Sequence, residues 1–136
     1  ISELTALLAS ARAAFARARA ETPWDIGYAV WLSRVELTEL RYRLGLGRVT
    51  AAEADAVLAP LTPFLAEPRD DPRLYEAAAR GREARAEARL RSRQDAGSEV
   101  AECIAMAERA VAVGPGIPSG RAVLERCQVL RRARSE

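Results

Sequence analysis

Apolar and small residues recur every three or four positions along most of the chain, the period of an α-helix that buries one face. In the first 20 residues the positions that share one face are Leu4, Leu8, Ala11, Phe15 and Ala18. Pro23 ends the pattern because proline lacks the amide that continues a helix. We therefore expect a first helix over residues 2–20.

The next two segments have the same period. Over residues 24–46 the apolar positions cover more than one stripe, which predicts a helix packed on two sides and ended by Gly45 and Gly47. Thr50 and Glu53 then form a capping-box pattern, which opens a third helix ending near residue 59. Pro63 favours one further short turn, because proline suits the first helical position.

Asp71 and Pro72 are a favourable cap and first residue for a long helix over 72–93. Small residues lie on two of its faces, which predicts neighbours on both sides. The remaining face is charged, and its residues are Glu76, Arg80, Glu83 and Glu87. Glutamate four residues before arginine favours an ion pair along the helix. Two more helices are expected over 98–113 and 119–132.

No stretch alternates with period two, and alanine, the best helix former, is the commonest residue. The prediction is an all-α protein of about six helices. A length of 136 residues suits a single domain over 1–136. Because the chain begins with Ile1 rather than methionine, we expect it to be a segment of a longer protein. The net charge of +2 is near balance and does not favour nucleic-acid binding.

Two stretches of the chain share one spacing of small residues and proline. Ala11, Phe15, Ala18 and Pro23 follow the pattern A-x3-F-x2-A-x4-P. The second set has the same spacing, at Cys103, Ala107, Ala110 and Pro115. This spacing resembles the second-helix signature of the tetratricopeptide (TPR) repeat. The middle of the chain departs from it, because Pro60 interrupts the corresponding helix.

The resemblance implies antiparallel helix pairs stacked as a solenoid, with partners bound in a groove lined by the first helix of each pair. The alanine-, arginine- and leucine-rich style is also similar to C-terminal regions of large bacterial serine/threonine kinases and related signalling proteins. An ordinary helical bundle is the alternative, because small residues at helical spacing occur in any alanine-rich helix.

The first helices of the implied pairs are 24–46 and 72–93, so their exposed residues are the candidates for partner binding. Arginines there can hold carboxylates through bidentate hydrogen bonds, and aromatic residues can supply apolar anchors. Trp24 is one such aromatic residue, and the other candidates are Tyr28, Trp31, Arg34, Arg41, Arg82, Arg85 and Arg89. The expected partner is a protein or peptide.

Catalysis is not expected. The chain contains no histidine to act as a base or metal ligand, and it lacks the protein-kinase signatures. No catalytic residue, metal or cofactor is therefore assigned. Cys103 and Cys127 lie in apolar helical stretches and are expected to be buried free thiols, with a disulfide between adjacent helices as the alternative.

The sequence also bears on location and on two alternative roles. We expect a cytoplasmic location and no membrane span. A nucleic-acid role would use the basic run at 89–93, but glutamates interleave with the nearby arginines and no aromatic stacking pattern accompanies them. A structural role would use the end helices, at 1–20 and 118–132, to space neighbouring domains or to form a homodimer.

Overall fold

The computed structural model describes residues 2–47 and 50–135, and the regular structure in those residues is entirely helical. Its elements are α1 (Ser2–Glu21), α2 (Ile26–Gly45), a 3-10 turn (Ala51–Ala54), α3 (Asp55–Leu58), α4 (Thr62–Leu65), α5 (Pro72–Arg91), α6 (Gly97–Val113) and α7 (Pro118–Ser135). The all-α prediction is confirmed. Within the described ranges, no helix combines the length and the apolar character needed to cross a membrane.

The helix ends follow the capping signals in the sequence. Asp25 accepts a hydrogen bond from the Gly27 amide at 2.8 Å, and Asp71 accepts one from the Arg73 amide at 3.0 Å. The Thr50 amide donates to Glu53 at 3.3 Å before the 3-10 turn. These bonds satisfy amide donors that the first turn of a helix leaves unpaired.

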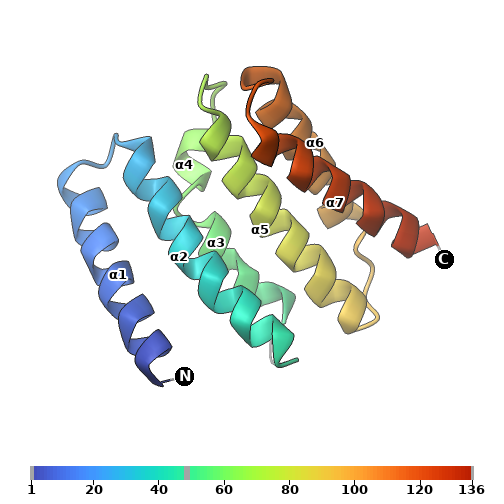
Figure 1. Ribbon diagram of the computed structural model, residues 1–136, viewed down its shortest axis with the longest axis horizontal. Coiled ribbons are helices and arrows are strands. Elements are labelled where there is room, and N and C mark those ends of the chain that lie inside the picture. The colour runs from blue at the N-terminus through green and yellow to red at the C-terminus, as the bar shows by residue number, and fades with distance from the viewer. Residues whose placement is uncertain (1, 48–49, 136) are drawn as a thin grey trace.

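The helices form two layers (Figure 1). α1, α2, α5 and α7 lie side by side in the front layer, and α3, α4 and α6 lie behind them. Within the front layer α1 contacts α2, α2 contacts α5, and α5 contacts α7. From the rear layer, α3 contacts α2 and α5, and α6 contacts α5 and α7. α5 is therefore the central helix of the molecule.

The small residues of α5 let its neighbours approach on both predicted sides. Leu74 and Ala78 are buried in a cluster with residues of α2 and α4, and Ala79 is buried against α6 and α7. A Cβ atom on Gly81 would lie only 2.6 Å from the Leu58 side chain, so glycine permits the close approach of α3. The prediction that the helix over 72–93 has neighbours on both sides is confirmed.

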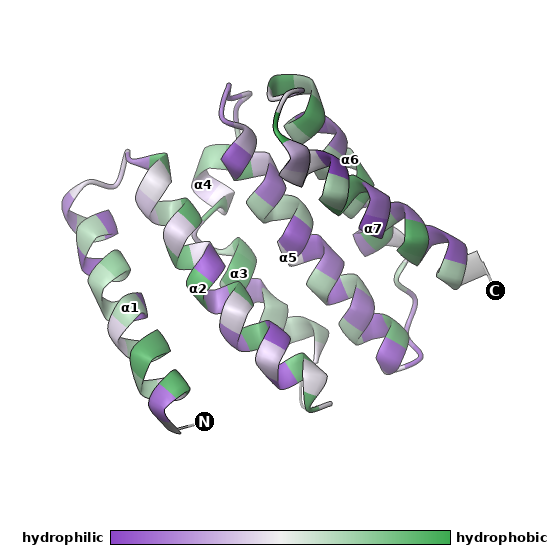
Figure 2. Cartoon of the chain, in the orientation of Figure 1, coloured by the Kyte–Doolittle hydropathy of each residue, from purple (hydrophilic) through white to green (hydrophobic). Residues whose placement is uncertain are grey.

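α1 packs less completely than the other long helices. α2 is its main neighbour, and the apolar stripe predicted for α1 is only half-buried. Leu7 is 68% exposed, and most of α1 has the hydrophobic colours in Figure 2. α1 therefore presents apolar surface at one edge of the front layer.

Candidate functional site

The charged face predicted for α5 lies in the front layer, between α2 and α7. It carries Glu76, Arg80, Glu83 and Glu87. Arg80 pairs with Glu76 at 2.9 Å, which confirms the predicted ion pair. Ser119 of α7 also donates to Glu76, at 2.9 Å. Hydrophilic colours recur along α5 in Figure 2, as this face requires.

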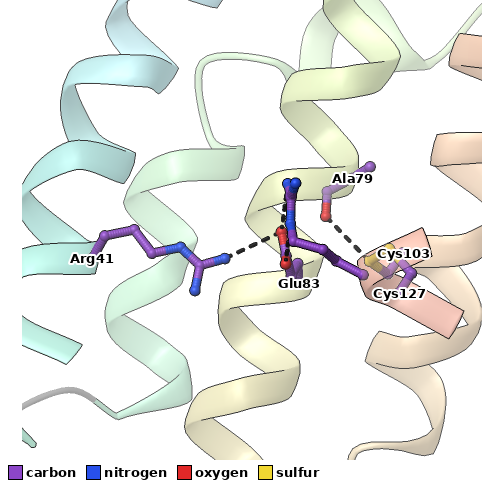
Figure 3. The surroundings of a disulfide bond; sticks show 6 residues. Arg41, Ala79, Glu83, Cys103 and Cys127 are labelled. Atoms are coloured by element: carbon purple, nitrogen blue, oxygen red, sulfur yellow. Dashed lines mark hydrogen bonds and ion pairs between the residues drawn. A yellow bond between two sulfur atoms is a disulfide. The ribbon is translucent and has the colours of Figure 1, made fainter. Parts of the chain in front are cut away.

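Glu83 joins all three of these helices. Its side chain is buried, and Arg126 of α7 donates to its two oxygens at 2.8 and 3.2 Å. Arg41 of α2 approaches it from the other side at 3.2 Å (Figure 3). Arg41 also pairs with Glu87. The hydrogen bond to Glu83 raises the pKa of the Arg126 guanidinium. The buried carboxylate thereby links α2, α5 and α7.

A groove follows these charges across the front layer. One part has a volume of 540 Å³ and is lined by Leu37, Thr38, Arg41, Arg80, Glu83, Glu87 and Arg126. A second part has a volume of 510 Å³ and is lined by Glu83, Glu87, Ala122, Glu125, Arg126, Val129 and Leu130. The two parts share three residues, so we treat them as one front groove. The part at α7 is the more apolar of the two.

Arg41 is the predicted candidate that lies in the front groove. Arg82, Arg85 and Arg89 instead approach Glu99, at the start of α6, with distances of 3.1, 3.1 and 3.8 Å. Glu99 is only 5% exposed. These three arginines therefore lie together, on the side of α5 that faces α6, and tie those two helices to each other.

The predicted aromatic candidates lie near the α1 edge. Trp31 stacks on Phe15 of α1 with ring centroids 6.1 Å apart, and the Arg34 guanidinium lies 4.9 Å from the Trp31 ring. Trp31 is 48% exposed and Trp24 is 74% exposed. Tyr28 is half-buried on the first turn of α2. Trp31 and the half-buried Arg34 form a second patch, next to the contact between the Phe15 and Trp31 rings.

Sequence reasoning did not select the α7 side of the groove. Arg126 is 43 positions from Glu83, and nothing local in the sequence indicates that they meet. Val129 is 53% exposed although it is apolar. An apolar residue on the outer face of the last amphipathic helix is a weak signal, and the helical periodicity of the sequence contains it.

The cysteines correct a sequence-based expectation. Cys103 of α6 and Cys127 of α7 form a disulfide, with Cα atoms 5.8 Å apart, so the expected free thiols are wrong and the alternative is right. Both residues face the same small-residue side of α5, where Ala79 is also buried. The Cys103 sulfur lies 3.5 Å from the Ala79 carbonyl oxygen (Figure 3).

The chemistry available in the front groove is hydrogen bonding and charge. Its buried carboxylate is already bound by two guanidiniums, from Arg126 and Arg41. Within residues 2–47 and 50–135, no cluster of three or more histidine, cysteine or acidic side chains is arranged to bind a metal ion. Searches against protein-family models, curated proteins and solved structures each found no match to this chain.

Proposed function

We propose that this chain is a non-catalytic protein–protein interaction module that binds its partner in the front groove. The observation that carries the proposal is the groove itself. It combines guanidinium groups from α2, α5 and α7 with apolar side chains of α7, within one concave surface. Such a mixture suits a protein segment, because each of these arginines stays partly exposed beside its glutamate partner and can hydrogen-bond polar groups of the segment, while the apolar side chains of α7 contact its apolar ones.

The TPR-like architecture is part of this proposal. In it, antiparallel helix pairs stack as a solenoid, with α2, α5 and α7 as the first helices of successive pairs. Its support is that Cys103, Ala107 and Ala110 are all buried on α6, where the signature requires small residues. Pro23 and Pro115 also lie just beyond the ends of α1 and α6. A bacterial signalling protein, such as a serine/threonine kinase, remains the proposed parent.

We propose the absence of catalysis because the buried carboxylates are already occupied by arginines. Glu76, Glu83 and Glu99 are buried, and each is engaged by arginine. A general acid or base needs a titrating group that can reach a substrate. These three carboxylates are buried and already occupied by arginines, so they are poorly placed to reach a substrate.

The alternative proposal is a spacer or self-association element that acts through the end helices. Its support is the apolar surface of α1, where Leu7 is exposed, and the nearby Trp24. A nucleic-acid role is less well supported. Arg82, Arg85 and Arg89 pair with Glu99, so their charge is partly neutralised within the protein.

The cytoplasmic location expected from the sequence has an observation against it. Disulfides are rare in cytosolic proteins because thiol reductants there keep cysteines reduced. The Cys103–Cys127 disulfide therefore favours an oxidising compartment.

Affinity purification from the source cell's extract tests the interaction. The baits are the wild-type chain, Val129→Asp in the groove, and Ala105→Asp on the exposed surface of α6 as the control. Both positions are exposed, so neither change removes a core contact. We expect a protein retained at high salt by the wild type and the control but not by Val129→Asp.

Two results would contradict the interaction proposal. One is that every retained protein binds all three baits equally. The other is recovery of nucleic acid alone, lost as salt rises, since phosphate contacts are strongly salt-dependent. A wild-type chain that elutes as a dimer and retains nothing would instead favour the self-association alternative.

A further inference from the structure

The disulfide lies at the junction between the front groove and the rear layer. Cys103 and Cys127 are both fully buried. They are also surrounded by apolar neighbours from three helices, including Ala79, Ala107 and Val123. A bond at this depth is protected from small reductants while the helices remain packed.

We propose that the working form of this chain is the oxidised one, matured in an oxidising compartment rather than in the cytosol. The oxidant is a disulfide of the thiol–disulfide oxidoreductase class. One cysteine thiolate attacks that disulfide and forms a mixed disulfide, releasing one thiol of the oxidant. The second cysteine thiolate then attacks the sulfur of the first, and the second thiol of the oxidant leaves. Two protein thiols and one disulfide become one protein disulfide and two thiols.

Burial determines when this exchange takes place. Each step needs an approach to sulfur that the packed helices do not allow, since both cysteines have no exposed surface. The exchange therefore precedes the docking of α7 on α6. Once docked, the bond is shielded, which is the behaviour of a structural disulfide and not of a reversible switch.

The consequence for the groove follows from the position of α7. Its main neighbours are α5 and α6. Arg126 bonds it to Glu83 of α5, and Cys127, the next residue along, bonds it covalently to α6. α7 also supplies Ala122, Val129 and Leu130 to the groove. The disulfide thus holds one wall of the groove in place; this part rests on the proposed function.

Trapping thiols in the native source cells tests the oxidation. Cells are quenched in acid, and free thiols are alkylated under denaturing conditions before the masses of the peptides that contain Cys103 and Cys127 are measured. A parallel sample is reduced first, as the control for complete labelling. We expect no alkylation without reduction and two alkylations after it. Two alkylations without prior reduction would overturn the proposal, whatever the chain binds.

Hydrogen exchange tests whether the disulfide holds α7 in place beside the groove. The oxidised wild type is compared with the same chain unfolded, reduced and refolded with a thiol reductant, and with Cys103→Ala/Cys127→Ala. We expect amide exchange in α7 to quicken at least tenfold in both forms that lack the disulfide, with exchange in α2 changed far less. Two results would overturn this role of the disulfide. One is that α7 is equally protected from exchange in all three forms, and the other is that protection is lost equally in α2 and α7. Neither arm uses a binding partner, so failure here is separate from failure of the interaction proposal.

Discussion

Replacing Glu83 with glutamine tests whether its ion pairs hold α2, α5 and α7 together. The buried carboxylate accepts from Arg126 at 2.8 and 3.2 Å and lies 3.2 Å from an Arg41 nitrogen. Glutamine has nearly the same shape but one acceptor oxygen, and its amide hydrogens face guanidinium donors. We therefore expect Glu83→Gln to weaken the contacts of α5 with both α2 and α7.

The size of the loss in unfolding free energy depends on how deeply Glu83 and its two arginine partners are buried. Breaking a fully buried ion pair costs about 3–5 kcal/mol, and one hydrogen bond to a charged group contributes about 1.5–3 kcal/mol. Only the Glu83 side chain is deeply buried, at 3% exposure, whereas Arg41 and Arg126 are 34% and 46% exposed. Both arginines can regain water, so we expect a loss of about 2 kcal/mol in the free energy of unfolding.

Urea unfolding, followed by circular dichroism at pH 7, measures this loss. The matched control is Glu108→Gln on the exposed surface of α6, which we expect to change stability by less than about 0.5 kcal/mol. A double-mutant cycle with Arg126→Gln should show that the two losses are not additive, by about 1 kcal/mol. A Glu83→Gln variant as stable as the control, or strict additivity, would refute the argument that this pair stabilises the layer.

Three further changes test other parts of the fold. Cys103→Ala/Cys127→Ala opens a covalent loop of sequence separation 24. Loop-closure entropy then predicts a loss of about 3.4 kcal/mol, measured as a lower urea midpoint than that of the oxidised wild type. Leu74→Ala, at a fully buried position, should cost about 2–5 kcal/mol in the same assay, and a smaller loss would mean that the site collapses readily. Arg73 lowers the pKa of Asp71, so the contribution of Asp71 is present above its unfolded pKa and is lost as pH falls below about 4. Asp71→Asn keeps the cap acceptor and should lose less stability than the wild type between pH 7 and pH 3; equal losses would contradict this.

Local signals in the sequence were enough to predict most helices. Proline, glycine and capping aspartate act through the backbone of their own segment, so the start of α5 at Pro72 was predictable from Asp71 and Pro72 alone. The third predicted helix was less regular than expected. A 3-10 turn opens it, Pro60 follows its end, and Thr62–Leu65 forms the separate turn that Pro63 indicated.

Contacts between distant segments could not be predicted in the same way. Arg82, Arg85 and Arg41 lie on neighbouring helices, yet the first two turn toward Glu99 and the third toward Glu83. Which acidic residue an arginine meets depends on how helices rotate when they pack, and periodicity on a single helix does not contain that information. The cysteine pair is a similar case, because its separation of 24 residues becomes a contact only once α6 and α7 dock.

The one-sided packing of α1 has a consequence for proteolysis. A helix whose apolar stripe stays half-buried opens locally at a lower free energy than the core helices, and segments that open are cut first. The residues between α1 and α2 include Pro23, Trp24 and Asp25, of which Trp24 is 74% exposed. Limited digestion should therefore release α1 early and leave a resistant fragment that contains α2 to α7. Any protein that covers the α1 edge would delay this cleavage, so the rate of cutting reports directly on whether that edge is occupied.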